Sequence, residues 1–234
     1  MRRTRRAALL MIGMLLTGLV VVPAVDANFV NPGDTGVAPD VFGPLGPLAP
    51  GTSTRTGINS NTSFSVQWVA EVHTAGLCPT CLDFVYQVTN RTTNPGGLTE
   101  PVGRITASSL VDGGTFAGFL TDVGYSIAPG PLGAGTVAPT SVDRSSPGTT
   151  VGFQFAPNPL DPGATTLVLV IRTNATTYLD GSLNFIDGDV LRVTAFAPNG
   201  AVPPAEIPEP ATLLLIGSGL AGLGLAARRS RRSR

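Results

Sequence analysis

The chain has 234 residues and a formal net charge of zero, with 15 arginines, no lysine and one histidine, His73. The lack of lysine excludes Schiff-base chemistry and the lysine-containing phosphate loops, and the single histidine limits any Ser-His-Asp or Cys-His centre to one imidazole. Charged residues make up 13% of the chain, about half the share in typical soluble domains. The arginines flank apolar runs and form no basic face among aromatics, which excludes a nucleic-acid binder.

The N-terminal residues 1–27 have the pattern of a secretory signal peptide. Four arginines lie within residues 2–6, residues 9–22 are almost entirely apolar, and Val25-Asp26-Ala27 offers small residues to a signal peptidase. A permanent anchor helix is the weaker alternative, because the apolar run is short for a hydrocarbon core roughly 30 Å thick. We therefore expect export, with the Sec and twin-arginine routes both open because Thr4-Arg5-Arg6 loosely fits the latter signal.

Residues 28–60 are rich in proline and glycine and show no hydrophobic period. Such composition is typical of a linker or a loosely packed lead-in. We expect the folded domain to span residues 61–200.

Alternation of apolar and polar residues predicts about seven strands in that domain, at residues 64–73, 83–89, 104–110, 123–128, 151–155, 167–171 and 190–196. Gly- and Pro-containing turns separate them, including Asp180-Gly181 and Asp187-Gly188, and residues 129–150 look like one long loop. No segment between the termini has helical periodicity. The expected fold is all-β, an antiparallel sandwich of immunoglobulin-like size.

Cys78 and Cys81 form a C-x-x-C motif between two expected strands. A redox-active motif normally opens a helix, and a zinc site needs two more ligands, for which His73 is the one obvious candidate. Two cysteines in an exported protein favour one disulfide, so we expect Cys78 and Cys81 to staple a hairpin.

Other candidate chemistry is weaker. His73 lies on the polar phase of its strand, which favours a surface histidine over a catalytic base, and no soluble Gly-x-Ser-x-Gly motif accompanies it. Acidic residues could serve glycoside hydrolysis or, for the three aspartates among them, calcium binding, but nothing in the sequence brings them together: Glu71, Glu100, Asp180, Asp187 and Asp189. Sugar stacking could use Trp68, Tyr86, Tyr125 and Tyr178, although the phase of Trp68 favours the core. We therefore expect no catalytic residue, metal or cofactor.

The C-terminal residues 201–234 contain an apolar segment followed by a basic tail. Residues 211–227 carry no charge, and as a helix they would span roughly 26 Å, the lower limit for crossing a bilayer. The basic residues that follow would stop transfer and hold the tail in the cytoplasm: Arg228, Arg229, Arg231, Arg232 and Arg234. A buried core helix is the weaker alternative.

This ending, with Pro208-Glu209-Pro210 before the apolar segment, closely resembles the PEP-CTERM sorting signal of exported proteins of Gram-negative bacteria. The resemblance covers about the last 28 residues. It implies processing by an exosortase, a membrane peptidase thought to cut near the tripeptide, and an association with extracellular polysaccharide.

Together these features predict an exported protein, briefly tethered by its C-terminal helix and then placed at the cell surface or in the extracellular matrix. The β domain would be structural or adhesive, with a secreted polysaccharide hydrolase or lyase, or a calcium- or glycan-binding module, as alternatives. Without both ends, residues 28–207 keep 6 arginines against 10 aspartates and 3 glutamates, a net charge of −7. The neutral balance of the whole chain therefore conceals an acidic domain, which favours solubility.

Overall fold

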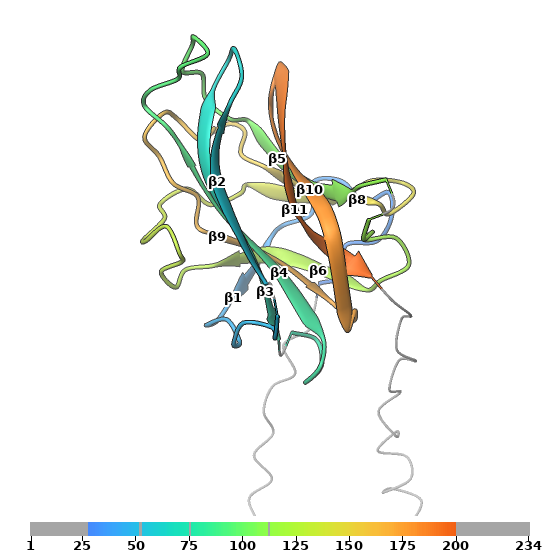
Figure 1. Cartoon of the computed structure of the whole chain (residues 1–234). Coiled ribbons are helices and arrows are strands. Elements are labelled where there is room, and N and C mark those ends of the chain that lie inside the picture. Colours follow the sequence, from blue (N-terminus) through green and yellow to red (C-terminus); the bar gives the residue numbers. More distant parts are fainter. Residues whose placement is uncertain (1–27, 52, 75, 112, 200–234) are drawn as a thin grey trace, which may run out of the picture.

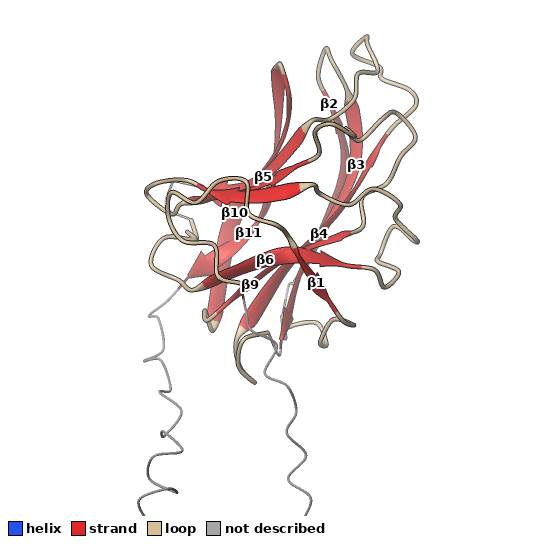
Figure 2. Cartoon of the chain, turned by 180° about the vertical axis from the view of Figure 1, so that it is seen from behind, coloured by secondary structure: helices blue, strands red, loops and turns tan. Residues whose placement is uncertain are grey.

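The computed structural model describes residues 28–51, 53–74, 76–111 and 113–199, and within these ranges the regular structure is all β. Eleven strands form two sheets (Figures 1 and 2). None of the residues in these ranges belongs to a helix long and apolar enough to cross a bilayer. The expected signal peptide at 1–27 and the expected helix at 211–227 lie outside the described residues.

The six-stranded sheet has the order β1-β6-β9-β4-β3-β2. Its neighbours are antiparallel except β1 and β6, which run parallel. The strands are β1 (Asp40–Phe42), β2 (Thr54–Ser60), β3 (Ser65–Thr74), β4 (Leu82–Asn90), β6 (Thr121–Ser126) and β9 (Val168–Thr173).

The five-stranded sheet has the order β11-β10-β5-β8-β7 and is antiparallel throughout. Its strands are β5 (Arg104–Ser109), β7 (Ser141–Arg144), β8 (Thr150–Gln154), β10 (Thr177–Asp187) and β11 (Asp189–Asn199). The long β10–β11 hairpin borders β2, so the edge strands of the two sheets meet along one side.

One hydrophobic core joins the two sheets. The predicted apolar phase of β3 and β4 is confirmed, because every member is buried there: Phe64, Val66, Trp68, Ala70, Val72, Phe84, Tyr86 and Val88. Phe153 and Phe185 of the other sheet belong to the same cluster. Side-chain alternation with period two places these residues on the inner faces, which gives the fold its sandwich-like form.

All seven predicted strands are present, as β3, β4, β5, β6, β8, β9 and β11. Four strands escaped prediction. β10 contains Asp180-Gly181, which we expected to form a turn; Gly181 instead lies in mid-strand, where a Cβ would stand 2.6 Å from the Cβ of Ala197. The real turn of this hairpin is at Gly188, whose φ of +73° suits glycine. β7 lies inside the expected long loop.

The expected linker at 28–60 is wrong for these residues. It contains β1 and β2, and Val30 and Ala49 are buried in the core. The prolines lie between these short elements, where they interrupt any period of apolar residues without preventing edge pairing. The described residues of this segment therefore belong to the folded domain.

Candidate functional site

A line of charged residues crosses the outer face of the six-stranded sheet. His73 on β3 is paired in register with Asp83 on β4, Asp83 with Arg172 on β9, and Arg172 with Asp122 on β6. Directly opposed residues on neighbouring strands lie close enough to interact. We call these four residues the charged row.

The N-terminal segment covers the charged row. At the ends of the row, backbone bridges place Leu48 beside His73 and Phe29 beside Asp122, and the carbonyl oxygen of Gly46 contacts the ring of His73. The guanidinium of Arg172 lies 4.0 Å from the ring centroid of Phe42. Although it lies on the outer face, most of the row is therefore shielded: His73 and Asp122 are 8% and 3% exposed and Asp83 is fully buried, while the side chain of Arg172 is 23% exposed. The prediction that His73 lies on the surface is wrong. It followed from the polar phase of the strand and did not include the segment that lies over the ring.

Both ring nitrogens of His73 are occupied. Its Nδ1 donates to the carbonyl oxygen of Gly46 at 2.7 Å, and its Nε2 lies 2.9 Å from the Oε2 of Glu71. Burial alone would lower the pKa of His73, but the hydrogen bonds with Glu71 and Gly46 and the charges of Glu71 and Asp83 outweigh it and raise the pKa. Because both partners accept hydrogen bonds, this geometry suits a protonated imidazole.

The two aspartates of the charged row have raised pKa values. Burial raises the pKa of Asp83 to about 6, despite the opposing charges of Arg172 and His73. Burial, together with a hydrogen bond to Asp40 and its charge, raises the pKa of Asp122 to about 7. Among the described residues, no hydrogen-bond partner is found for either carboxylate oxygen of Asp83. The same holds for the Oδ1 of Asp122. The pKa values of both aspartates therefore lie much closer to neutral pH than usual, and Arg172 and His73 are the cations that face Asp83 in the row.

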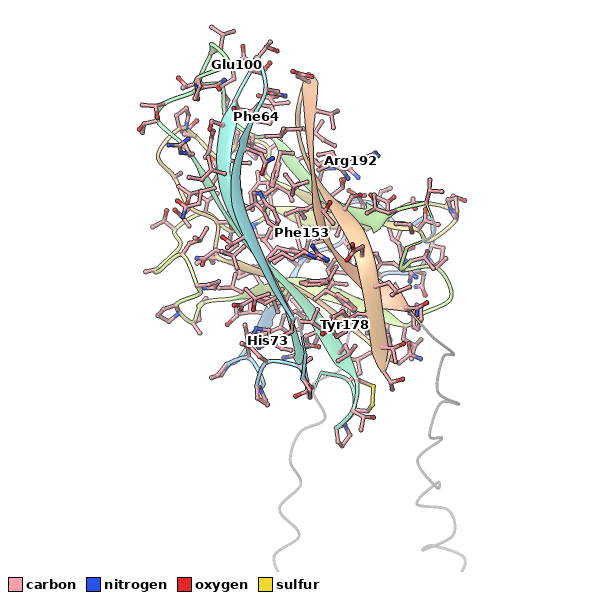
Figure 3. All side chains as sticks on the ribbon, in the orientation of Figure 1. Phe64, His73, Glu100, Phe153, Tyr178 and Arg192 are labelled. Carbon is pink, nitrogen blue, oxygen red and sulfur yellow. A yellow bond between two sulfur atoms is a disulfide. The ribbon has the colours of Figure 1, made fainter. Side chains whose placement is uncertain are left out.

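A second polar site lies where the edge strands of the two sheets meet. It is an open pocket of about 550 Å³, which we call the seam pocket. Its lining comes from β2, β10, β11 and the segment after β5: Arg55, Leu110, Val111, Gly113, Tyr178, Leu179, Asp180 and Phe196. The β10–β11 hairpin places it away from the Asp187–Asp189 turn, and Figure 3 shows Tyr178 toward the lower end of the molecule, opposite Glu100.

An ion pair forms the polar part of the seam pocket. Arg55 donates a hydrogen bond to Asp180, and its guanidinium lies 5.0 Å from the ring centroid of Phe196. The ring of Tyr178 packs edge-on against Phe196 at 5.4 Å, and its hydroxyl donates to the carbonyl oxygen of Pro50 at 3.3 Å. The side chains of the pair remain 34% and 53% exposed. The pocket therefore presents a charge-neutral polar group on a fixed aromatic base.

Cys78 and Cys81 form a disulfide at the tip of the β3–β4 hairpin. Figure 3 shows this bond at the lower end of the molecule, and Cys81 is buried. The expected disulfide is present. It bonds both sulfur atoms that a metal or redox site at this motif would use.

The acidic residues singled out in the sequence do not converge. Asp189, next to the turn of the β10–β11 hairpin, accepts hydrogen bonds from Asn61 and Thr62 at the β2–β3 turn, whereas Asp180 lies toward the start of β10, in the seam pocket. Within the described ranges, no group of three or more His, Cys, Asp or Glu side chains is placed to hold a metal ion. The Asp180, Asp187 and Asp189 calcium site is therefore not assembled in this structure.

Of the four aromatic residues considered for sugar stacking, Trp68 and Tyr86 are buried in the core and Tyr178 lines the seam pocket. Three residues of these two sites were not predicted from the sequence pattern: Arg55, Phe196 and Arg172. Arg55 lies in a segment whose composition is typical of a linker, so no strand was expected there. Phe196 lies in a predicted strand, but its partner strand β10 was not predicted. Spacing along the chain carries no signal for Arg172, since its partners come from other strands.

The sorting residues named above, Pro208, Glu209 and Pro210, and the basic tail lie outside the described residues. A family model, the PEP-CTERM protein-sorting motif, matches residues 206–232. This match includes the tripeptide, the apolar segment and four of the five basic tail residues, Arg228, Arg229, Arg231 and Arg232. No curated protein matches the chain at a significant level. The match implies an exported protein that an exosortase sorts through its C-terminus toward the cell surface. The chain therefore carries a PEP-CTERM protein-sorting motif at residues 206–232.

Proposed function

We propose that the β domain is a non-catalytic structural or adhesive element, displayed at the cell surface or in the extracellular matrix. The observation that carries this proposal is the position of His73, the one histidine of the chain. Both ring nitrogens are engaged and the ring is covered, so it is not free to act as a base. The two-sheet architecture with one core supports an immunoglobulin-like sandwich, which suits display of a rigid surface.

Processing at both ends belongs to the same proposal. A signal peptidase would remove residues 1–27, and residues 211–227 would hold the chain in the membrane until an exosortase cuts near Pro208-Glu209-Pro210. The family match supports the second step.

Intact-mass measurement of the protein from medium and membrane fractions tests this processing. We expect Glu209→Ala, or deletion of residues 228–234, to leave a heavier form retained in the membrane. Asp161→Ala is the control, because it removes an acid from an exposed turn outside the motif at residues 206–232. Unchanged mass and secretion in both variants would contradict the proposal.

A deletion that keeps both ends tests the adhesive role. Cells producing residues 1–27 joined to residues 200–234 would still export and process a peptide but lack the β domain. We expect these cells to lose cohesion and to retain less extracellular matrix under shear. Cohesion equal to that of the parent cells would count against a structural or adhesive function.

One observation favours the rival hydrolase. Asp122 shares a hydrogen bond with Asp40, and its pKa is raised to about 7, as in carboxyl pairs that hold one proton during acid catalysis. Its 3% exposure speaks against contact with a polymer. Release of sugars by the purified exported protein, abolished by Asp122→Asn, would establish the rival.

A further inference from the structure

The seam pocket combines an ion pair with exposed aliphatic side chains. Val111 is 93% exposed and Leu179 is 44% exposed, and both line the pocket together with Leu110. Scattered exposed apolar residues are ordinary on a protein surface, but here they border a concave site that also holds Arg55 and Asp180. Ligand pockets of a few hundred Å³ with mostly apolar walls and a few fixed polar groups are typical of small-molecule sites.

Among the described residues that line the pocket, the charges of Arg55 and Asp180 balance each other. Arg55 and Asp180 are paired, so a phosphate or carboxylate ligand would have to compete with Asp180 for the arginine. Both groups nevertheless keep hydrogen-bonding capacity, because a guanidinium has five N–H donors and a carboxylate has roughly four acceptor sites. Donors and acceptors side by side suit hydroxyl groups, each of which both donates and accepts.

The polar group is held in place before any ligand arrives. Phe196 is almost fully buried and supports the guanidinium of Arg55, while Tyr178 packs against the same ring and bonds to Pro50. Fixing polar groups in advance reduces the entropy lost on binding. This base lies on the regular strands β2, β10 and β11, which are more rigid supports than a loop.

We propose that the seam pocket binds one uncharged pyranose unit of an extracellular polysaccharide. Vicinal hydroxyls would bond to Asp180 and Arg55, and the C–H face of the ring would lie against the aliphatic part of the lining. This inference rests on the proposed adhesive function. It identifies uncharged sugars as the class of ligand that the domain would bind.

Titration of the exported protein with defined oligosaccharides tests the site. The probes are hexasaccharides of glucose, mannose, galactose and N-acetylglucosamine, with hexagalacturonate as the charged probe. We expect one or more uncharged probes to bind more tightly than the charged one. Asp180→Ala, Arg55→Ala and Val111→Ser should each weaken that binding at least tenfold.

Matched controls separate the pocket from the rest of the hairpin. Asp187→Ala and Val190→Ser alter the same kinds of side chain near the other end of the β10–β11 hairpin, and they should bind like the unaltered protein. Circular dichroism and thermal unfolding establish that each variant is folded. No binding of any uncharged probe at millimolar concentration, tighter binding of hexagalacturonate, or equal loss in the controls would overturn the proposal.

The cohesion assay distinguishes failure of the pocket from failure of the proposed function. If deletion of the β domain abolishes cohesion but Asp180→Ala cells adhere normally, the adhesive function stands and the pocket is not its site. If oligosaccharides bind at the pocket but deletion leaves cohesion unchanged, the sugar site stands and the adhesive function fails.

Discussion

The charged row and the seam pocket are built from the same three parts. In each, an arginine lies opposite an aspartate and over a phenylalanine ring: Arg172 with Asp83 and Phe42 in the row, and Arg55 with Asp180 and Phe196 in the pocket. They differ in cover, because the side chain of Asp83 is 1% exposed and that of Asp180 is 53% exposed. The same Arg–Asp–Phe arrangement can therefore hold a chain segment in place where it is buried. Where it is exposed to solvent, it remains available to a ligand.

Cover also decides what each arginine contributes to stability. Removing one partner of a buried pair leaves an uncompensated charge in a medium of low polarity, whereas water solvates the survivor of an exposed pair. The row should consequently matter for folding and the pocket for recognition. Four measurements bear on this contrast.

Arg172→Ala should produce the largest effect. It removes the cation between Asp83 and Asp122 and the contact with Phe42, so we expect a loss of about 3–5 kcal/mol in the free energy of unfolding. Urea unfolding measures it. Arg192→Ala, which removes an arginine from the other sheet, is the control and should lose about 1 kcal/mol or less. Equal losses in the two variants would contradict a special role for the row.

The pH dependence of stability should come from the same residues. Asp83 and Asp122 have pKa values raised above their ordinary 3.8, to about 6 and about 7, so the folded state binds more protons than the unfolded state in that interval. Their contribution to stability therefore falls as pH rises from about 4 to about 7. The raised pKa of His73 acts in the same direction above 6.5, since its contribution is lost as pH passes the folded value.

Asp122→Asn tests this assignment, because an amide cannot titrate. We expect the change in Tm between pH 5 and pH 8 to shrink by on the order of 5 °C in this variant. Asp161→Asn, in an exposed turn, should leave the pH profile unchanged. A profile identical to that of the unaltered protein in Asp122→Asn would show that other groups control it.

Removing the disulfide should have a smaller effect. The bond joins residues only three positions apart, so the chain-entropy model allows at most about 2 kcal/mol. We expect Cys78→Ser with Cys81→Ser to lose no more than that in urea unfolding and to keep the charged row intact. A loss comparable to that of Arg172→Ala would mean that the hairpin tip also secures the covering segment.

Arg55→Ala should have the smallest effect on stability, about 1 kcal/mol or less, because its ion pair is exposed. The same variant should lose at least tenfold in sugar affinity. Arg55→Ala and Arg172→Ala thus compare two similar arginines. The free energy of unfolding and the sugar affinity are measured separately in each variant. A large loss of stability in Arg55→Ala would erase the distinction between the two sites.

The strands that could be predicted from the sequence are those in which apolar and polar residues alternate. In Phe64 to Val72 and Phe84 to Val88 every second residue is apolar because one face packs in the core, and this period predicted both strands although Val69 and Val85 are buried on the other face. β10 escaped because Gly181 lies in mid-strand for close packing, which composition cannot distinguish from a turn. β1 and β2 pair at the sheet edges, where little apolar burial is needed to hold a strand.

The candidate sites were less accessible to prediction. Arg172 meets Asp83 and Asp122 through pairing between β4, β9 and β6, and register between distant strands leaves no mark on the spacing of residues. His73 was assigned to the surface because its strand phase is polar, while the segment that covers it looked like a linker. By contrast, the sorting motif is read from contiguous residues, and the family match confirms it at residues 206–232.

The position of β9 fixes when the two parts of the six-stranded sheet can join during folding. This strand lies between β6 and β4, so it alone joins the β1–β6 pair to the β4-β3-β2 group within the sheet. The β2-β3-β4 meander and the pairing of Leu48 with His73 involve residues 48–90 alone, but the two parts of the sheet join only when residues 168–173 are in place. Because distant pairing is slow to form, the part of the charged row that joins Asp83 to Asp122 through Arg172 should be completed late in folding.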